Sequence, residues 1–321
     1  MNSREMIEKN EEYYLSEYAT KSINSRGREN KENESPLRTC FQTDLTRIVN
    51  SHPFKREKFK TQVFILPKND HIMDRLTHTL EVTNVARIIS SSLRLNSDLT
   101  EAIAMGHDTA HTCFGHAGER ALNKLADNGY SHAKESYRRL NILSGMNLTY
   151  EVLDGIANHS GLSNNPKAQT LEGKIVNHAD KIAYLTSDAE NAISMGIIKD
   201  IPDKVKKKLG STKTEIVDNL ISSIVRASLN QPYIKMEDDF YEAFVEFREF
   251  NFNEIYYNKR LQEGNKKAEL VIEYLYDYFI KHPESLPEVS EPDNLKQSVI
   301  DYIAGMTDKY AMNMFSDFTN L

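Results

Sequence analysis

The chain has 321 residues, of which 27% are charged and 39% hydrophobic, and its formal net charge at pH 7 is -7. This length and composition predict a globular protein with a sizeable core, in one large domain or two modest ones, and exclude a disordered protein. The negative net charge argues against a surface dedicated to coating nucleic acid, because such binding requires net or local positive charge. Nucleic acid is therefore not expected as the main partner.

The two cysteines, Cys40 and Cys113, do not have the spacing of a disulfide framework or of a thiolate zinc site. The first residues lack the apolar run of a secretory signal. No window approaches the roughly 18 consecutive apolar residues of a membrane span. We therefore expect a cytoplasmic protein without a membrane partner.

The amino-terminal half alternates short helical segments with polar connections. Residues 1–36 combine one short predicted helix with a polar run, and we expect a flexible arm because that run buries little apolar surface. Residues 60–67 allow a short extended segment, since β-branched and aromatic residues are frequent there. Residues 74–93 are predicted to form a helix in which His78 shares a face with apolar Val82 and Val85.

Further helices are predicted along the rest of the chain. Asp98 is expected to cap a helix that ends at His107 and Asp108, and Gly115 to open the next helix. Helical spacing of apolar residues then predicts helices from about residue 150, at 171–197, 215–228, 238–250, 265–281 and 294–315, with 199–213 as an exposed connection. The predicted class is all-α, with at most a minor short strand pair.

The first candidate site is a divalent-metal centre made by His78, His107, Asp108 and Asp180. Adjacent residues at a helix end lie about 100° apart around the axis, so His107 and Asp108 reach one ion only from the side between them. Imidazoles and carboxylates without a thiolate suit six-coordinate Mn, Fe, Co, Ni or Mg better than structural zinc. The alternative for His78 is a hydrogen-bonded core histidine.

The second candidate group has acid and base capacity and contains His111, His116 and Glu119. His116 and Glu119 are three residues apart on a predicted helix, so the carboxylate can orient the imidazole as a general acid. His111 faces the same cavity if the turn after Asp108 continues. The alternative is that His116 and Glu119 only occupy a helix N-terminus, where glutamate is favoured by the helix dipole.

The third candidate group lies on the predicted helix 171–197. Asp180, Lys181, Tyr184 and Asp188 fall within an arc of about 100° on the helical wheel. One face thus carries a metal ligand, a cation, a phenol and a second carboxylate, which suits a sugar linked to a triphosphate. For Lys181 and Asp188 taken separately, a solvated face is the alternative.

Several motifs together resemble the bacterial deoxynucleoside triphosphate triphosphohydrolases, the dGTPase-like branch of the HD-domain phosphohydrolases. The resemblance covers nearly the whole chain. The matching segments are 38–44 (RTCFQTD), 60–63 (KTQV), 75–82 (RLTHTLEV), 107–108 (HD) with His111, 114–119 (FGHAGE), 179–184 (ADKIAY) and 301–308 (DYIAGMTD).

The resemblance implies an HD-domain helical core at residues 37–200 and a packed C-terminal helical region at 201–321. It also implies the metal site made by His78, His107, Asp108 and Asp180. Phosphate contacts are implied for Arg75, His111, His132 and Lys181, and contacts near the sugar 3′-hydroxyl for Gln62 and Asp188. Tyr184 is expected to lie against the deoxyribose and to leave little room for a 2′-hydroxyl.

The implied activity is metal-dependent hydrolysis of dNTPs, such as dGTP, to deoxynucleoside and inorganic triphosphate. In this hypothesis water attacks the α-phosphorus in line and His116, oriented by Glu119, protonates the departing 5′-oxygen, with His111 and His132 as rival donors. The alternatives are an HD phosphohydrolase acting on nucleoside monophosphates or signalling nucleotides, and a non-catalytic nucleotide sensor.

The resemblance further implies a homo-oligomer, a tetramer or a hexamer, with a dNTP activator as a second nucleotide partner. The chain departs from the family pattern at several positions, namely Met73, Thr109, Ala110, Cys113, Ala133, Glu135 and Ser187. Every proposed ligand and acid is nevertheless present, so activity is expected.

Overall fold

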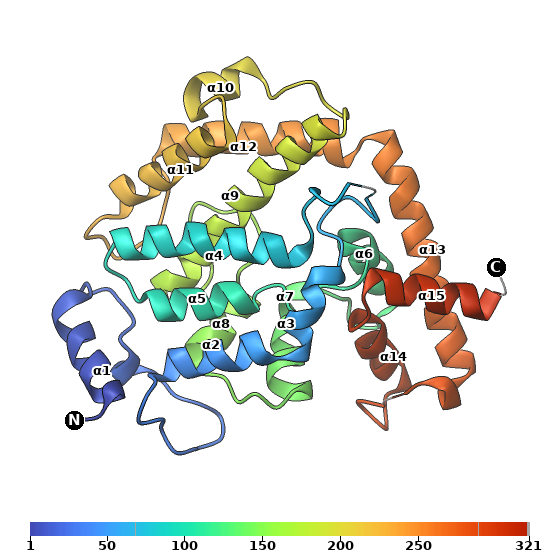
Figure 1. Cartoon of the computed structure of the whole chain (residues 1–321), viewed down its shortest axis with the longest axis horizontal. Helices are drawn as coiled ribbons and strands as arrows, with labels where there is room; N and C mark the ends of the chain where they lie inside the picture. The colour runs from blue at the N-terminus through green and yellow to red at the C-terminus, as the bar shows by residue number, and fades with distance from the viewer. Residues whose placement is uncertain (68, 288, 320–321) are drawn as a thin grey trace.

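The structure is a computed structural model that describes residues 1–67, 69–287 and 289–319 (Figure 1). It consists of helices and connections. Within the described ranges, β pairing is limited to isolated bridges between Arg28 and Thr149 and between Thr61 and Asp74. The all-α prediction is confirmed. The predicted extended segment at 60–67 is a series of bends with one of these bridges.

From the amino terminus, the α-helices are α1 (Ser3–Tyr14), α2 (Cys40–Asn50), α3 (His52–Arg56), α4 (Arg75–Ser92), α5 (Ser97–Gly106), α6 (Gly115–Leu125), α7 (His132–Tyr137), α8 (Tyr150–Ala157) and α9 (Leu171–Ser194). They are followed by α10 (Asp203–Leu209), α11 (Lys213–Ser228), α12 (Asp238–Asn251), α13 (Lys259–Lys281), α14 (Leu295–Ala304) and α15 (Asp308–Thr319). Two π-helical turns, Arg138–Leu143 and Phe252–Tyr256, extend α7 and α12.

The start of α5 differs from the sequence prediction. Asp98 was expected as the N-cap, but the side chain of Asn96 accepts the hydrogen bonds from the backbone N–H groups of Asp98 and Leu99, at 3.1 Å each. The helix therefore begins at Ser97. Asparagine is as good an N-cap as aspartate, so local sequence allows either Asn96 or Asp98 to cap this helix, and tertiary contacts determine that Asn96 does so.

The predicted exposed connection at 199–213 contains the short helix α10, so that prediction was wrong in part. Val205 and Leu209 are fully buried, four residues apart on one face of α10, while lysines occupy the rest of its surface. The lysine-rich composition of this segment predicts exposure, but its two apolar residues form one face that packs the helix against α11 and α12.

Two apolar clusters organise the helices, and the long loop 107–114 runs between them. One cluster is built largely on α2, α4, α5, α8, α9, α11 and α12, and α4 packs against both α5 and α9. The other joins α6 to α13, α14 and α15, which lie together on the right of Figure 1. Helix α6 thus lies within the predicted core region in sequence but packs with the C-terminal helices.

Polar side chains connect the segment 1–36 to α2 and to the residue that caps α5. Glu11 on α1 accepts from the backbone N–H of Ser22 at 2.6 Å and from the amide of Asn96 at 3.2 Å. Arg28 forms a buried ion pair with Asp44 of α2. The division into an arm, a core and a C-terminal region stays a prediction. Residues 320–321, at the end of the predicted C-terminal region, lie outside the described residues.

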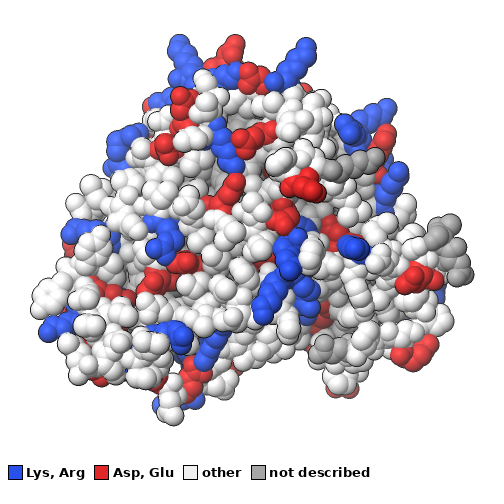
Figure 2. All heavy atoms as spheres, viewed as in Figure 1, with Lys and Arg blue, Asp and Glu red and all other residues white. Residues whose placement is uncertain are grey.

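The surface carries charges of both signs. On the face drawn in Figure 2, lysine and arginine side chains are interspersed with aspartate and glutamate. A membrane span needs a long apolar helix, and the described helices include none that meets this requirement.

Candidate active site

The pair His107 and Asp108 follows directly on the last turn of α5. The Nδ1 of His107 lies 2.6 Å from the carbonyl oxygen of Ala104, and because a carbonyl only accepts, Nδ1 is the donor. The lone pair of the neutral ring is then on Nε2, which is buried and has no hydrogen-bond partner among the described residues. A backbone contact therefore fixes the ring in the tautomer that a metal ligand needs.

The four predicted metal ligands converge although they come from three different helical segments. The His78 Nε2 lies 3.2 Å from Asp180 Oδ1 and 3.8 Å from Asp108 Oδ2, while the His107 Nε2 lies 3.5 Å from Asp108 Oδ2 and 3.9 Å from Asp180 Oδ1. Two ligands about 2.1 Å from one ion are at most about 4.2 Å apart. These four imidazole–carboxylate distances are below that limit, and the ligand atoms of His78, His107 and Asp108 all lie within 4.8 Å of one another, with Asp180 beside the two imidazoles.

Arg75 places a buried positive charge against this cluster. Its guanidinium forms an ion pair with Asp108 and also donates to the carbonyl oxygen of Thr61 at 3.0 Å. Asp108 is buried, which alone would raise its pKa, but the neighbouring His107 and Arg75 hold that pKa well below the usual range. Asp108 is therefore a carboxylate throughout the physiological pH range.

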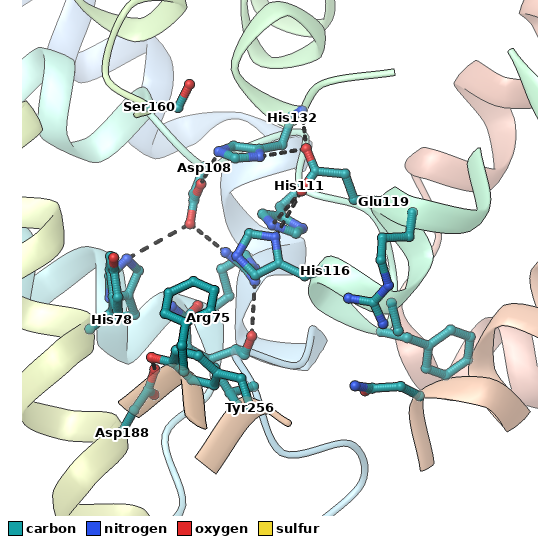
Figure 3. A pocket seen from close by; sticks show the side chains of 18 of the residues that line it. Arg75, His78, Asp108, His111, His116, Glu119, His132, Ser160, Asp188 and Tyr256 are labelled. Carbon is teal, nitrogen blue, oxygen red and sulfur yellow. Dashed lines mark hydrogen bonds and ion pairs between the residues drawn. The ribbon is translucent and has the colours of Figure 1, made fainter. Parts of the chain in front are cut away.

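A second polar group is centred on Glu119 of α6. One carboxylate oxygen accepts from the Nδ1 of His116 at 2.8 Å, and the other accepts from the Nδ1 of His132 at 2.8 Å (Figure 3). Burial alone would raise the pKa of Glu119, but the hydrogen bonds from these two histidines lower it well below the usual range. Burial alone would lower the pKa of His132, but the Glu119 contact raises it.

The histidines of this group differ in exposure. The side chain of His116 is 63% exposed at the mouth of the site, whereas His111 is buried, with its ring 4.7 Å from the stacked ring of His132. Burial and the nearby Arg75 hold the pKa of His111 well below the usual range, so its imidazole is neutral. The group therefore contains an exposed imidazole, a buried neutral one and a half-buried basic one around a single carboxylate.

The loop between α5 and α6 is held by buried contacts to distant segments. Lys60 donates to the carbonyl oxygens of His111 at 2.5 Å and of Ala304 at 2.9 Å, and burial lowers the pKa of this lysine to about 7. Asp308 of α15 accepts from the backbone N–H groups of Thr61 and Phe114, at 3.1 and 2.9 Å. The C-terminal helices thus fix the position of His111 and His116.

A tight turn brings α6 close to this loop. Phe114 has φ 62° and Gly115 has φ 56°, so the cap and the first residue of α6 are both left-handed. At Gly118 a Cβ atom would lie 2.1 Å from the carbonyl oxygen of Cys113. Any larger residue at position 118 would displace α6, and Glu119 with it, from the loop that carries His111.

The predicted face of α9 points into the site. Lys181 and Asp188 are 4% and 1% exposed, which excludes the solvated-face alternative. The ammonium group of Lys181 donates to Asp180 Oδ2 at 3.1 Å and to the carbonyl oxygen of His159 at 2.7 Å. The hydroxyl of Tyr256 donates to one oxygen of Asp188 at 2.6 Å, while the other oxygen has no partner among the described residues.

A cavity of about 660 Å³ connects these groups, a size typical of small-molecule sites. Every predicted site residue except His107 lines it; these are Gln62, Arg75, His78, Asp108, His111, His116, Glu119, His132, Asp180, Lys181, Tyr184 and Asp188. His107 lies fully buried behind His78. The lining also includes aromatic residues of the C-terminal part, Phe252, Tyr256 and Tyr257, together with Arg248.

The sequence analysis missed His159, which follows α8 and is 1% exposed. Its Nε2 lies 3.2 Å from the Nε2 of His132 and 3.8 Å from Asp108 Oδ1. Burial and the neighbouring His107 and His132 lower the pKa of His159 to about 3, so the ring is neutral. The available signal is a histidine two residues before Gly161, in a segment that follows a predicted helix.

Asp188 supports a stability prediction. Burial raises its pKa to about 7, whereas an unfolded aspartate titrates near 3.9. Between about pH 4 and 7 the Asp188 carboxyl is therefore protonated in the folded protein but ionised in the unfolded chain. The folded state loses stability relative to the unfolded state as the pH rises through this range. We expect Asp188→Asn to gain stability over the wild type as pH rises, by up to about 4 kcal/mol. The measurement is urea unfolding at pH 5 and pH 8.5 in EDTA, and a pH-independent difference would contradict the shifted pKa.

Comparisons with known proteins agree with this geometry. Residues 75–185 match the family model of the HD domain, and residues 234–317 match that of the phosphohydrolase-associated domain. A protein of Caldanaerobacter subterraneus subsp. tengcongensis is 42% identical, over 99% of this chain and 96% of its own. Proteins of Clostridium perfringens and Desulfatibacillum aliphaticivorans are 42% and 39% identical, each over 98% of this chain and 97% of their own. All three are described as deoxyguanosinetriphosphate triphosphohydrolase-like proteins, and the chain belongs to this family of HD-domain phosphohydrolases.

Proposed function

We propose that the protein hydrolyses deoxynucleoside triphosphates, dGTP among them, to the deoxynucleoside and inorganic triphosphate. The observation that carries the proposal is the composition of the cavity lining. It combines three of the predicted metal ligands, His78, Asp108 and Asp180, and the cations Arg75 and Lys181 with Tyr184, Asp188 and further aromatic rings. The metal ligands and cations suit a triphosphate, and the aromatic rings suit a deoxynucleoside.

The residues His78, His107, Asp108 and Asp180 would hold one divalent ion, of which Mn, Mg, Fe, Co and Ni suit the donor set. Such an ion supplies Lewis-acid polarisation of a phosphate oxygen and a lowered pKa for a bound water. The role of Arg75 and Lys181 is to neutralise charge that develops on the phosphates. His111, a neutral buried imidazole, offers a donor to a phosphate oxygen.

Protonation of the departing 5′-oxygen is assigned to His116. Its exposed ring lies at the cavity wall, and Glu119 accepts from its Nδ1 at 2.8 Å. In the imidazolium form the opposite nitrogen, Nε2, carries the proton to be given away. The Nε2 of His132 is instead directed at His159, which makes His132 the weaker candidate for this step.

Incubation with dGTP and Mn²⁺, followed by ion-exchange analysis, tests the function. Deoxyguanosine and inorganic triphosphate are the expected products. Release of orthophosphate or pyrophosphate would instead indicate the alternative HD phosphohydrolase reaction. If dGTP binds but is not hydrolysed with Mn, Mg, Fe, Co or Ni, the result would indicate a nucleotide sensor.

Tyr184 is proposed to set deoxyribose selectivity. It lies one helical turn after Asp180 and lines the cavity, where its ring would exclude a 2′-hydroxyl. We expect Tyr184→Ala to reduce the ratio of kcat/KM for dGTP over GTP at least tenfold, because removal of the ring opens space for the ribose. Tyr257→Ala, at the same cavity, is the matched control, and an unchanged ratio in Tyr184→Ala would contradict the assignment.

Assembly into a tetramer or hexamer, activation by a dNTP and a cytoplasmic location stay predictions. Light scattering with and without dATP, combined with dGTP hydrolysis in dNTP mixtures, tests the first two.

A further inference from the structure

The motif 301–308 lies outside the cavity, since none of its residues is among those that line it, but it bonds to elements that build the site. Asp301, at its start, forms an ion pair with Arg138 at 2.7 Å, in the π-helical turn that extends α7. The carbonyl oxygen of Ala304 accepts from Lys60 at 2.9 Å. The motif therefore ties the C-terminal helices to α7 and to the segment that precedes α4.

The last residue of the motif, Asp308, is 3% exposed, and its carboxylate accepts hydrogen bonds from two separate segments. Its Oδ2 accepts from the backbone N–H of Thr61 at 3.1 Å and from the hydroxyl of the same residue. Its Oδ1 accepts from the backbone N–H of Phe114, the cap of α6, at 2.9 Å. Gln62 follows the first donor directly, and His116 lies two residues after the second. One carboxylate thus links the backbones that carry two residues of the cavity wall.

The two segments that Asp308 joins are packed against each other without spare room. A Cβ atom at Gly115 would lie 2.9 Å from the carbonyl oxygen of Gln62 and 3.2 Å from that of Thr61. The same two carbonyl oxygens accept from the guanidinium of Arg75, at 3.4 and 3.0 Å. A change in the spacing of these segments would therefore also move the guanidinium that is proposed to neutralise phosphate charge.

We propose that Asp308 is a positioning residue, which fixes the distance between Gln62 and His116 in the hydrolysis proposed above. The inference rests on that proposed function. An ionised carboxylate is required, because it presents an acceptor oxygen to each segment and carries no donor. Asparagine keeps one acceptor oxygen and would turn its NH₂ group toward the other N–H donor, so it can hold only one of the two segments.

Asp44 of α2 provides a matched control for the loss of a buried carboxylate. It is 0% exposed, and its Oδ2 accepts from the backbone N–H and the hydroxyl of Thr149 at 2.8 and 2.7 Å, the pattern that Asp308 has with Thr61. Its Oδ1 accepts from Arg28. Neither Asp44 nor Thr149 lines the cavity, so an asparagine at position 44 removes a comparable set of buried bonds away from the site.

Steady-state kinetics with saturating dGTP on the full-length, Mn²⁺-loaded protein test the proposal, at a temperature well below the melting point of each variant. Asp308→Asn is expected to lower kcat about 10- to 100-fold, the effect of misplacing reacting groups by about 1 Å. Its bound manganese should stay at the wild-type level, because Asp308 is not among the proposed ligands. Asp44→Asn should melt at a lower temperature than the wild type but keep the wild-type kcat.

Hydrogen–deuterium exchange without substrate gives a second readout. Peptides that cover 60–62 and 112–116 should exchange faster in Asp308→Asn than in the wild type, because their backbone N–H groups lose a fixed acceptor. The same peptides should exchange at the wild-type rate in Asp44→Asn.

Wild-type kcat in folded Asp308→Asn, or an equal loss of kcat in Asp44→Asn, would overturn the proposal. If Asp308→Asn fails to fold, Gly115→Ala replaces it, because the added Cβ forces the same segments apart while Asp308 is intact; wild-type kcat in that variant would overturn the proposal. If the wild type releases no triphosphate from dGTP, the proposed reaction is rejected and the exchange experiment decides alone. Equal exchange in the wild type and Asp308→Asn would then reject the positioning role.

Discussion

Replacement of Asp108 by asparagine is expected to reduce dGTP hydrolysis by about 10³-fold or more and to remove bound metal. Asp108 lies against both imidazoles of the metal-ligand group, with its Oδ2 3.8 Å from the Nε2 of His78 and 3.5 Å from that of His107. Loss of a metal ion removes several kcal/mol of transition-state stabilisation, and each 1.4 kcal/mol corresponds to a factor of ten in rate.

The Asp108→Asn variant also tests folding, because Asp108 neutralises buried Arg75. An unpaired buried charge costs about 3–5 kcal/mol, so the variant should unfold at lower temperature than the wild type. The measurement combines kcat/KM for dGTP, manganese content and a thermal melt. Asp218→Asn, an exposed residue of α11, serves as the control. A folded Asp108→Asn variant with wild-type turnover would contradict the metal site.

Replacement of Glu119 by glutamine is expected to reduce kcat by about 10²–10⁴-fold, the range typical of a lost general acid or base. One carboxylate orients both His116 and His132, so its loss disturbs two imidazoles at once. Glutamine keeps one acceptor oxygen but no charge, and His132 loses the contact that raises its pKa. Binding of the ion at His78 and His107 should be unchanged, because Glu119 is not among its ligands.

The companion variant His116→Ala separates the roles of the two histidines. If His116 is the proton donor, this variant should lose as much turnover as Glu119→Gln while its metal content stays at the wild-type level. Steady-state kinetics and elemental analysis on both variants provide the comparison. Full turnover in His116→Ala, with loss only in Glu119→Gln, would reassign the proton donor to His132 or His111.

Much of the site could be predicted from local sequence because its residues occupy helix faces and helix ends. Helical periodicity alone predicts that one face of α9 carries Asp180, Lys181, Tyr184 and Asp188. In the structure these residues line the cavity, and Lys181 and Asp188 are buried. His78 is buried with its Nε2 3.2 Å from Asp180 Oδ1, which fits both a hydrogen-bonded core histidine and a metal ligand, so the metal-ligand role of His78 stays a prediction. Helical period is a local property, so these features needed no tertiary information.

Other features depend on contacts between distant segments, which spacing does not encode. His159 is 51 residues beyond Asp108 in the chain and meets it only because α8 packs against both α5 and α9. Asp308 holds the turn at Phe114 from 194 residues away. The cap at Asn96 and the helix α10 were missed for the related reason that packing chose between two locally acceptable conformations.

Isotope labelling during dGTP hydrolysis tests the central claim most directly. The reaction is run in water enriched in ¹⁸O with Mn²⁺, and the products are examined by mass spectrometry. Attack of water on the α-phosphorus predicts one ¹⁸O atom in the inorganic triphosphate and none in deoxyguanosine. Label in orthophosphate or pyrophosphate, or in the deoxyguanosine 5′-hydroxyl, would contradict the account.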